Sequence, residues 1–211
     1  MRSRLRQAIT YISYAESQDM IVPLTRHLFK LVAQDAQLLC HHLPRGAVMG
    51  LNIAPDHLAA ESFRLDVEEW IAAMPPEHFN YAFEITERTM VSGQGTAAVF
   101  DWLHDRHIAI AIDDFGTGHS ALIYLEKFRF DYLKIDRGFV QSIGMETVTS
   151  PVLNLARKLN LNTVAEGVET EEQAAWLIKH GITCMRGYLF SRPLPPTQLI
   201  SFLQQQQASQ P

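Results

Sequence analysis

Two kinds of apolar spacing alternate along most of the chain. Apolar residues at intervals of three and four predict amphipathic helices, and short apolar runs predict strands between them. The expected helices span residues 22–42, 65–74, 96–104, 121–127, 150–159, 171–180 and 196–205. The expected strands span residues 48–53, 80–85, 108–113, 132–135, 163–166 and 183–189. Strands that alternate with helices in this way predict βα units and a parallel sheet.

Local signals refine the helices. In the first helix, the residues expected to share one buried stripe are Leu24, Leu28, Leu31, Val32 and Leu39. Pro196 suits the first position of the last helix, where its missing N–H would have no partner. Thr170 and Gln173 match a capping box. We expect one domain over residues 1–203, followed by a solvated polar tail over residues 204–211.

The two faces of the expected strands differ in side-chain size. Side chains alternate across a strand, so Ile108, Ile110 and Ile112 form a bulky face, and the opposite face is small and ends in Asp113. A bulky face is expected to meet helices. A small face with a polar group at the strand end is typical of the inside of a closed barrel, with its functional groups at one rim. The pattern predicts an α/β fold with a TIM-like (β/α) barrel.

Composition and charge narrow the class of protein. The 211 residues include 18 Lys and Arg against 23 Asp and Glu, a net charge of −5, which argues against a general nucleic-acid footprint. Apolar runs fall short of the ~18 residues that span a bilayer, and no signal peptide is recognised. Cys40 and Cys184 lack metal-type spacing, and we expect them to be small buried hydrophobic residues. We therefore expect a soluble domain in a reducing, cytoplasmic compartment.

Polar side chains collect at the C-terminal ends of the expected strands. They are Asn52, Glu84, Asp113, Asp114, Lys134 and Glu166. Carboxylate and amide oxygens suit hard cations such as Mg²⁺ or Mn²⁺. The adjacent Asp113 and Asp114 suit two metal ions that clamp the attacking and leaving oxygens of a phosphodiester. Glu166 suits a general base for water, and Lys134 suits a charge partner for water or phosphate.

Each of these residues also has an ordinary structural interpretation. Asn52 alone is typical of a turn, Glu84 of a salt bridge, and Lys134 of a cation at a barrel end. Glu87 alone is typical of a helix start, where the dipole favours a carboxylate. The set taken together favours metal chemistry, because clustered carboxylates would otherwise repel one another.

Five segments resemble the EAL domain family in order and spacing. They are EITE at 84–87, DDFGTGHS at 113–120, LKID at 133–136, VAEGVET at 164–170 and GYLFS at 187–191. The resemblance covers residues from about Tyr11 to Leu203 and implies a TIM-like barrel that hydrolyses cyclic di-GMP to linear pGpG. In detail, the chain resembles the catalytic part of membrane-anchored enterobacterial enzymes with a periplasmic CSS-type sensor. We therefore expect a cytoplasmic domain of an inner-membrane protein.

The resemblance also assigns metal ligands. It implies that Asn52, Glu84 and Asp113 hold a first Mg²⁺ or Mn²⁺ ion. The second ion would be held by Asp113, Asp114 and Glu166, and Glu166 would also activate water. These roles agree with the rim expected from the strand faces.

Other implied roles concern the substrate and partners. Lys134 would hold a catalytic water or the phosphate, and Glu87 would anchor the loop 115–120. The partner molecule is cyclic di-GMP, and a homodimer through the loop and helix after Asp114 is expected by analogy. We expect no nucleic-acid polymer as a partner and no membrane contact by this domain itself.

The chain departs from the family pattern in places. The motif Glu-Ala-Leu-x-Arg is absent, and residues 1–6 align only with the end of its strand, with Arg4 in the position of a phosphate-contacting Arg. Arg186 stands where the family usually has Gln, and this extra cation could displace a metal or bind phosphate. The family barrel has eight strands and the sequence predicts six, so the first two are missing or incomplete. Either the natural protein supplies the missing residues, or a partner fills the gap, or the protein is destabilised, and we favour the first.

These departures leave alternatives to hydrolysis. A degenerate EAL domain would bind cyclic di-GMP as a receptor without cutting it, which the absent Glu and Arg186 favour. A barrel that serves only as a protein-interaction platform would bind neither nucleotide nor metal. Retention of the carboxylates favours the phosphodiesterase.

Overall fold

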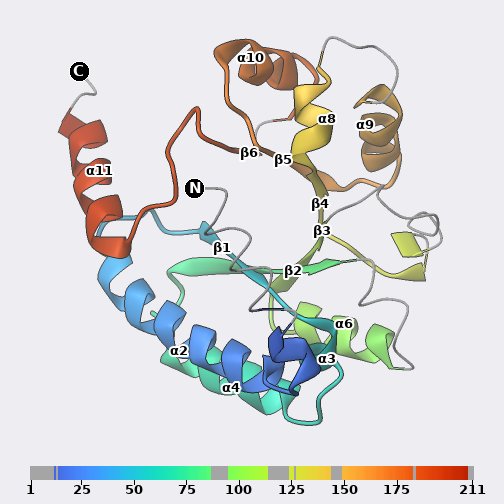
Figure 1. The fold of residues 1–211 in the computed structure, drawn as a ribbon, viewed down its shortest axis with the longest axis vertical. Coiled ribbons are helices and arrows are strands. Elements are labelled where there is room, and N and C mark those ends of the chain that lie inside the picture. The colour runs from blue at the N-terminus through green and yellow to red at the C-terminus, as the bar shows by residue number, and fades with distance from the viewer. Residues whose placement is uncertain are drawn as a thin grey trace. The chain divides into compact units, whose positions relative to one another are not determined.

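The computed structural model describes residues 12, 14–86, 95–113, 124–125, 127–143, 149–182 and 184–208 (Figure 1). Contacts group the chain into two compact units. The first unit draws on residues 1–49, 53–80 and 196–211, and the second on residues 50–52 and 81–195. The expectation of one domain over residues 1–203 stays a prediction. Among the described residues, no helix is both long and apolar enough to cross a membrane.

One six-stranded sheet runs through the structure in chain order, β1-β2-β3-β4-β5-β6. The strands are β1 (Ala47–Asn52), β2 (Phe79–Thr86), β3 (Ile108–Asp113), β4 (Tyr132–Ile135), β5 (Asn162–Glu166) and β6 (Cys184–Arg186). Each neighbouring pair from β2 to β6 is parallel. A parallel pair needs a long crossover connection, usually a helix. The prediction of βα units around a parallel sheet is confirmed.

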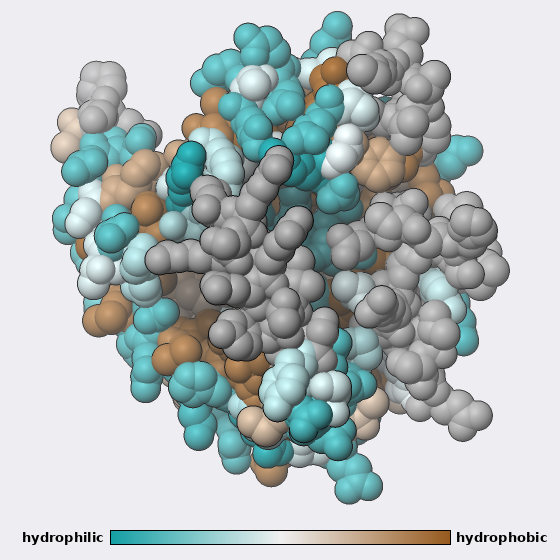
Figure 2. All heavy atoms as spheres, viewed as in Figure 1, coloured by the Kyte–Doolittle hydropathy of each residue, from teal (hydrophilic) through white to brown (hydrophobic). Residues whose placement is uncertain are grey.

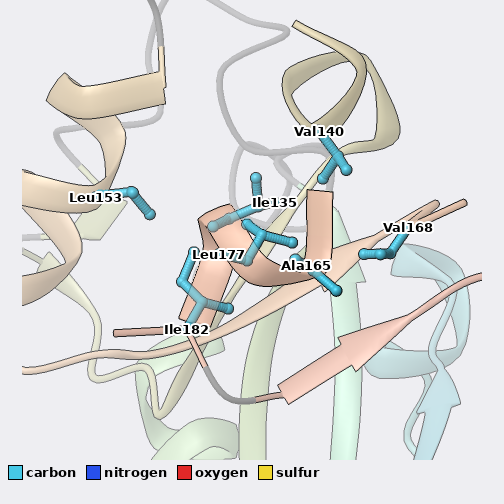
Figure 3. Close-up of a cluster of buried hydrophobic side chains, with 8 residues drawn as sticks. Ile135, Val140, Leu153, Ala165, Val168, Leu177 and Ile182 are labelled. Atoms are coloured by element: carbon cyan, nitrogen blue, oxygen red, sulfur yellow. The ribbon is translucent and has the colours of Figure 1, made fainter. Parts of the chain in front are cut away.

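The bulky strand face is buried as predicted. Ile108, Ile110 and Ile112 of β3 are fully buried. In the second unit, helices α6 (Thr96–His104), α8 (Arg137–Gln141), α9 (Thr149–Lys158) and α10 (Glu171–Lys179) accompany the strands. Figure 3 shows the cluster that joins α9 and α10 to the sheet, formed by Ile135, Val140, Leu153, Ala165, Val168, Ala174, Leu177 and Ile182. This core fixes the backbone of β4 and β5, from whose ends polar side chains project.

Helix α10 begins as its sequence predicts. The Thr170 side chain accepts a hydrogen bond from the backbone N–H of Gln173, and the Gln173 side chain accepts one from the N–H of Thr170. The capping box is confirmed. The short helix α8 was not expected, although Asp136 caps it by accepting a hydrogen bond from the N–H of Gly138.

The predicted stripe of the first helix is wrong at three of its four leucines, although Leu39 is buried as expected. Helix α2 (Ile21–Leu39) packs against α3 (Pro55–Leu58), α4 (Phe63–Ala73) and α11 (Pro196–Ala208). The side chains that it buries are Ile21, Thr25, Phe29, Ala33, Ala36 and Leu39. Leu24, Leu28 and Leu31 are exposed, and Figure 2 shows hydrophobic atoms at the surface where Figure 1 draws α2. Small side chains such as Ala33 and Ala36 let the neighbouring helices approach closely. The face with these alanines is therefore buried in place of the face with the leucines.

Two smaller expectations also change. Cys40 is half-buried and Cys184 is exposed, and both are free thiols, so neither is the buried hydrophobic residue expected. Helix α11 continues to Ala208, so residues expected in a polar tail are helical, although those described beyond Leu203 are exposed.

Candidate active site at the ends of the parallel strands

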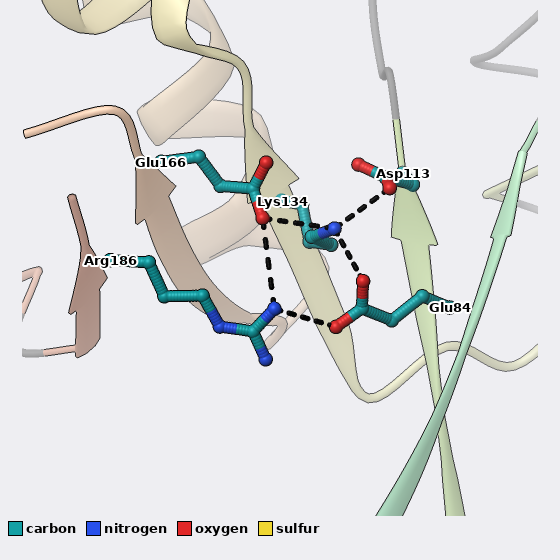
Figure 4. A network of polar contacts seen from close by, with 5 residues as sticks. All are labelled: Glu84, Asp113, Lys134, Glu166 and Arg186. Atoms are coloured by element: carbon teal, nitrogen blue, oxygen red, sulfur yellow. Dashed lines mark hydrogen bonds and ion pairs between the residues drawn. The ribbon is translucent and has the colours of Figure 1, made fainter. Parts of the chain in front are cut away.

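Five consecutive strands each contribute one charged side chain to a single cluster (Figure 4). The residues are Glu84 on β2, Asp113 on β3, Lys134 on β4, Glu166 on β5 and Arg186 on β6. Each lies at or near the C-terminal end of its strand. The carboxyl ends of parallel strands share one edge of a sheet, so the topology itself brings these side chains together.

Lys134 lies at the centre of the cluster. Its Nζ is 2.6 Å from Glu84 Oε2, 2.7 Å from Asp113 Oδ2 and 2.9 Å from Glu166 Oε1. An ammonium group has three donors, and the three carboxylates take one each. Its side chain is only 5% exposed. The three strand-end carboxylates therefore surround one buried positive charge.

Arg186 supplies a second positive charge from the edge of the cluster. Its Nη1 lies 2.8 Å from Glu84 Oε1 and 3.8 Å from Glu166 Oε1. The Arg186 side chain is 48% exposed, whereas that of Glu84 is 5% exposed. Both oxygens of Glu84 thus have a cationic partner, Lys134 on one and Arg186 on the other.

The pKa values in the cluster favour the charged forms. Burial would raise the pKa of Glu84, but the hydrogen bond and charge of Lys134, together with Arg186, outweigh it and lower that pKa. Burial would also lower the pKa of Lys134, but hydrogen bonds to Asp113, Glu84 and Glu166 outweigh it and raise the pKa well above its usual range. Glu84 is a carboxylate and Lys134 an ammonium at neutral pH.

Gly50 on β1 is a further functional residue, which the sequence reasoning did not single out. A Cβ built there would collide with Glu84 Oε1 and lie 2.9 Å from Arg186 Nη2. Any larger side chain would therefore push the Glu84–Arg186 pair aside. The signal was present in the sequence. Val48, Gly50 and Asn52 alternate on one face of the expected strand, and Gly50 is the position on that face without a side chain.

The structure places the predicted site residues unevenly. It brings Glu84, Asp113, Lys134, Glu166 and Arg186 into the cluster. Asn52 is exposed at the end of β1, two residues beyond Gly50 and on the same strand face. Asp114, Glu87 and Arg4 lie outside the described residues, so their predicted roles stay predictions.

The chemistry of the cluster suits a hard divalent cation. Its oxygen donors are carboxylates, the ligand type that Mg²⁺ and Mn²⁺ prefer, and the neighbouring strand β1 ends in the amide of Asn52. Three of these carboxylates already surround a cation, the Lys134 ammonium. In their present positions, however, no three described His, Cys, Asp or Glu residues form a group that could hold a metal ion. The donors fit a metal, and the two internal cations occupy them.

Comparison with known proteins gives the family. A model of the EAL domain matches residues 3–193. The chain belongs to the EAL domain family. The resemblance inferred from five sequence segments is confirmed, and EAL domains are a metal-dependent family.

Curated relatives of this EAL domain are longer proteins. It is 56% identical over 197 residues to the probable cyclic di-GMP phosphodiesterase PdeN of Escherichia coli strain K12. The matched region covers 92% of this chain and 38% of PdeN. It is 36% identical over 196 residues to the cyclic di-GMP phosphodiesterase PdeL of the same strain, over 90% of this chain and 54% of PdeL. The chain thus spans about half or less of these relatives.

Solved EAL structures share its fold. The EAL enzyme Bd1971 in its form bound to cAMP and cyclic di-GMP matches with a TM-score of 0.82 at 26% identity, over 92% of this chain and 55% of Bd1971. The phosphodiesterase PaMucR in complex with c-di-GMP matches with a TM-score of 0.78 at 29% identity, over 90% of this chain and 85% of PaMucR. The described residues therefore form an incomplete TIM-like barrel of the EAL type, with six strands.

Proposed function

We propose that this EAL domain hydrolyses cyclic di-GMP to linear pGpG with a divalent cation bound at the strand ends. The observation that carries the proposal is the convergence of Glu84, Asp113 and Glu166, from three different strands, on one buried cation. Two relatives that match most of this chain are cyclic di-GMP phosphodiesterases by name, and they support the same substrate. The finer choice between Mg²⁺ and Mn²⁺ and between one ion and two is part of this proposal.

The reaction breaks one bond between phosphorus and a 3′ oxygen of the ring and forms a bond from phosphorus to the oxygen of water. A bound divalent cation would polarise the phosphate and lower the pKa of water. Glu166 is 30% exposed, so it can reach a water at the cluster and accept its proton. The departing 3′ oxygen takes up a proton, which completes the linear product.

The remaining side chains of the cluster position these groups. Glu84 and Asp113 supply oxygen ligands from adjacent parallel strands, and Asn52 supplies an amide at the end of β1. Lys134 donates to all three carboxylates and holds them at one point. Its implied contact with water or phosphate, like that of Arg186 with substrate, is part of the proposal.

We also propose a cytoplasmic location within an inner-membrane protein. The two free thiols, Cys40 and Cys184, support a reducing compartment. The proposal includes no contact of this domain with the membrane and a homodimer through the loop and helix after Asp114. Sedimentation velocity with and without cyclic di-GMP tests the dimer, and a single monomeric species in both conditions would contradict it.

The test of function is product formation by the purified domain. Cyclic di-GMP with Mg²⁺ or Mn²⁺ should yield pGpG on a chromatogram, and Asp113→Ala should abolish turnover because it removes one oxygen donor from the cluster. Asp105→Ala is a matched control, because that carboxylate follows α6 at the opposite end of β3. Full turnover by the Asp113→Ala variant would contradict the proposed site.

A receptor without hydrolysis is the second candidate, and one observation favours it. Both oxygens of Glu84 are held by internal cations, which opposes metal binding. In that case, calorimetry would show micromolar binding of cyclic di-GMP and no pGpG after prolonged incubation with either metal. Product formation by the wild-type domain excludes this candidate.

A further inference from the structure

Glu84 cannot bind a divalent cation in the arrangement seen here without losing a partner. Its Oε2 accepts from Lys134 at 2.6 Å and its Oε1 accepts from Arg186 at 2.8 Å. A divalent ion on either oxygen would lie within a few ångströms of an ammonium or guanidinium group, where like charges repel strongly. One of the two internal cations must therefore move when a metal binds.

The two cations differ in how firmly they are held. Lys134 is 5% exposed, and its Nζ is shared by three carboxylates on three strands. The Arg186 side chain is 48% exposed. Its Nη1 lies 2.8 Å from Glu84 Oε1 and farther, at 3.8 Å, from Glu166 Oε1. Moving Lys134 would remove a hydrogen-bond donor from three carboxylates at once, whereas Arg186 can turn its guanidinium into solvent. Arg186 is the partner that can leave.

The position of Arg186 also suits a side chain that moves. It lies on β6, which is three residues long, and opposite Glu166 in the β5–β6 register. The guanidinium lies against Gly50, where the absence of a side chain leaves room for it beside Glu84. These contacts hold the guanidinium on Glu84 without enclosing it.

We propose that Arg186 is a displaceable counter-ion of this EAL domain, which neutralises Glu84 when metal is absent and must release Glu84 when metal binds. The inference rests on the proposed metal-dependent function. Arg186 then sets the metal affinity, because binding of the ion includes the loss of the Arg186–Glu84 pair. It acts through Glu84 and is a positioning residue.

The test measures metal affinity directly, with Mn²⁺ alone as the probe. Isothermal titration of the domain with Mn²⁺ should give a dissociation constant about 10-fold lower for Arg186→Gln than for wild type, which corresponds to ~1.4 kcal/mol. Arg137→Gln is the matched control, because Arg137 pairs with Glu169 at 2.7 Å and with none of the cluster carboxylates. Its Mn²⁺ affinity should equal that of wild type.

A thermal measurement provides a second readout. Without metal, Arg186→Gln should have a lower Tm than wild type, because Glu84 loses a counter-ion, and saturating Mn²⁺ should raise the Tm of Arg186→Gln more than that of wild type. An Mn²⁺ affinity of Arg186→Gln that is equal to or weaker than wild type would overturn the inference. So would a gain in affinity of the same size in Arg137→Gln, because it would reflect net charge alone.

The outcomes separate this inference from the proposed function. Wild type that produces pGpG, combined with unchanged Mn²⁺ affinity in Arg186→Gln, overturns the counter-ion role and leaves the phosphodiesterase proposal standing. Tighter Mn²⁺ binding by Arg186→Gln, with no pGpG from any variant, supports the counter-ion role and overturns hydrolysis.

Discussion

Two buried carboxylates in this chain, Asp66 and Glu84, each pair with basic side chains, and their surroundings differ in the ratio of carboxylates to cations. In the first unit, Asp66 accepts hydrogen bonds from Arg26 Nε at 2.8 Å and Ser62 Oγ at 3.0 Å, and its Oδ2 lies 3.0 Å from His57 Nε2. In the second unit, Glu84 is held by Lys134 and Arg186. Each buried carboxylate thus has a half-exposed Arg partner, with side-chain exposures of 45% for Arg26 and 48% for Arg186.

The difference lies in the number of carboxylates. Asp66 is one carboxylate with one arginine and a neutral histidine, so its cluster is balanced. The strand-end cluster has the carboxylates of Glu84, Asp113 and Glu166 against two cations. Counted over the described residues, the three carboxylates exceed the two cations by one charge, which favours a cationic ligand. A satisfied carboxylate such as Asp66 stabilises the fold, whereas an excess of carboxylates at strand ends indicates a binding site.

Removal of the Lys134 ammonium should have the largest effect on stability and activity among the changes to the two clusters. Lys134→Met leaves three carboxylates around an apolar side chain, so we expect the free energy of unfolding to fall by about 3 kcal/mol or more and activity to be lost. Urea unfolding measures the change. Millimolar Mn²⁺ should restore part of the stability, because a bound cation replaces the lost charge; a variant as stable as wild type without metal would contradict the balance described here.

Removal of the Asp66 carboxylate should lower the free energy of unfolding and leave turnover unchanged. Asp66→Ala leaves His57 and Arg26 without their acceptor, and we expect a loss of about 2 kcal/mol in the free energy of unfolding. Turnover per folded molecule should match wild type. Arg26→Gln is the control, with a smaller loss because the arginine is half-exposed. A fall in turnover of folded Asp66→Ala would mean that the two clusters are functionally linked.

Gly50→Ala tests how closely β1 approaches the strand-end cluster. The added Cβ would collide with Glu84 and crowd Arg186, so we expect about 1–2 kcal/mol of destabilisation from overpacking and a loss of turnover. Gly46→Ala is a comparison substitution just before β1, where a Cβ would meet, among the described residues, Asn80 Nδ2 at 3.7 Å, although its φ of +81° adds backbone strain. Turnover that falls equally in both variants would argue against a specific collision at Glu84.

The smallest expected effect is a pH dependence from the Asp66 cluster. His57 is fully buried between Phe29 and Phe63, and its Nδ1 has no hydrogen-bond partner among the described residues. Burial lowers the pKa of His57 below 6.5, although Asp66 opposes the shift. As pH falls below about 6.5, the unfolded chain binds a proton before the folded chain does, so stability decreases.

Urea unfolding at several pH values between about 7.5 and 5 checks this dependence. His57→Gln removes the titrating ring and should flatten the slope, whatever its effect on stability at neutral pH. The pKa of Asp66 is also lowered, because Arg26, His57 and Ser62 outweigh its burial, so its contribution is lost only in stronger acid. An equal slope in wild type and His57→Gln would contradict a buried neutral histidine.

Local sequence signals predicted some elements well. The Ile and Ala alternation of β3 and the run that forms β4 matched the observed bounds Ile108–Asp113 and Tyr132–Ile135. The capping box at Thr170 was also right. These features depend on neighbours within a few residues, so the pattern itself contains the information needed.

Choices between surfaces were not predictable in the same way. Helix α2 has apolar side chains on more than one face, and it buries Phe29, Ala33 and Ala36 while leaving Leu28 exposed. The buried face depends on which neighbours can approach, which periodicity does not specify. The exposure of Cys184 follows for the same reason, because it depends on what covers the start of β6.

The amino-acid sequence by itself determined that acidic groups stand at successive strand ends, since alternation along a strand and parallel βα order leave them at one edge. Only the tertiary structure decided how they are paired: that Lys134 reaches three carboxylates, that Arg186 takes the second oxygen of Glu84, and that Gly50 leaves the space for this contact. Pairing is decided in three dimensions because an ion pair depends on distances of a few ångströms between residues as far apart in the chain as Glu84 and Arg186.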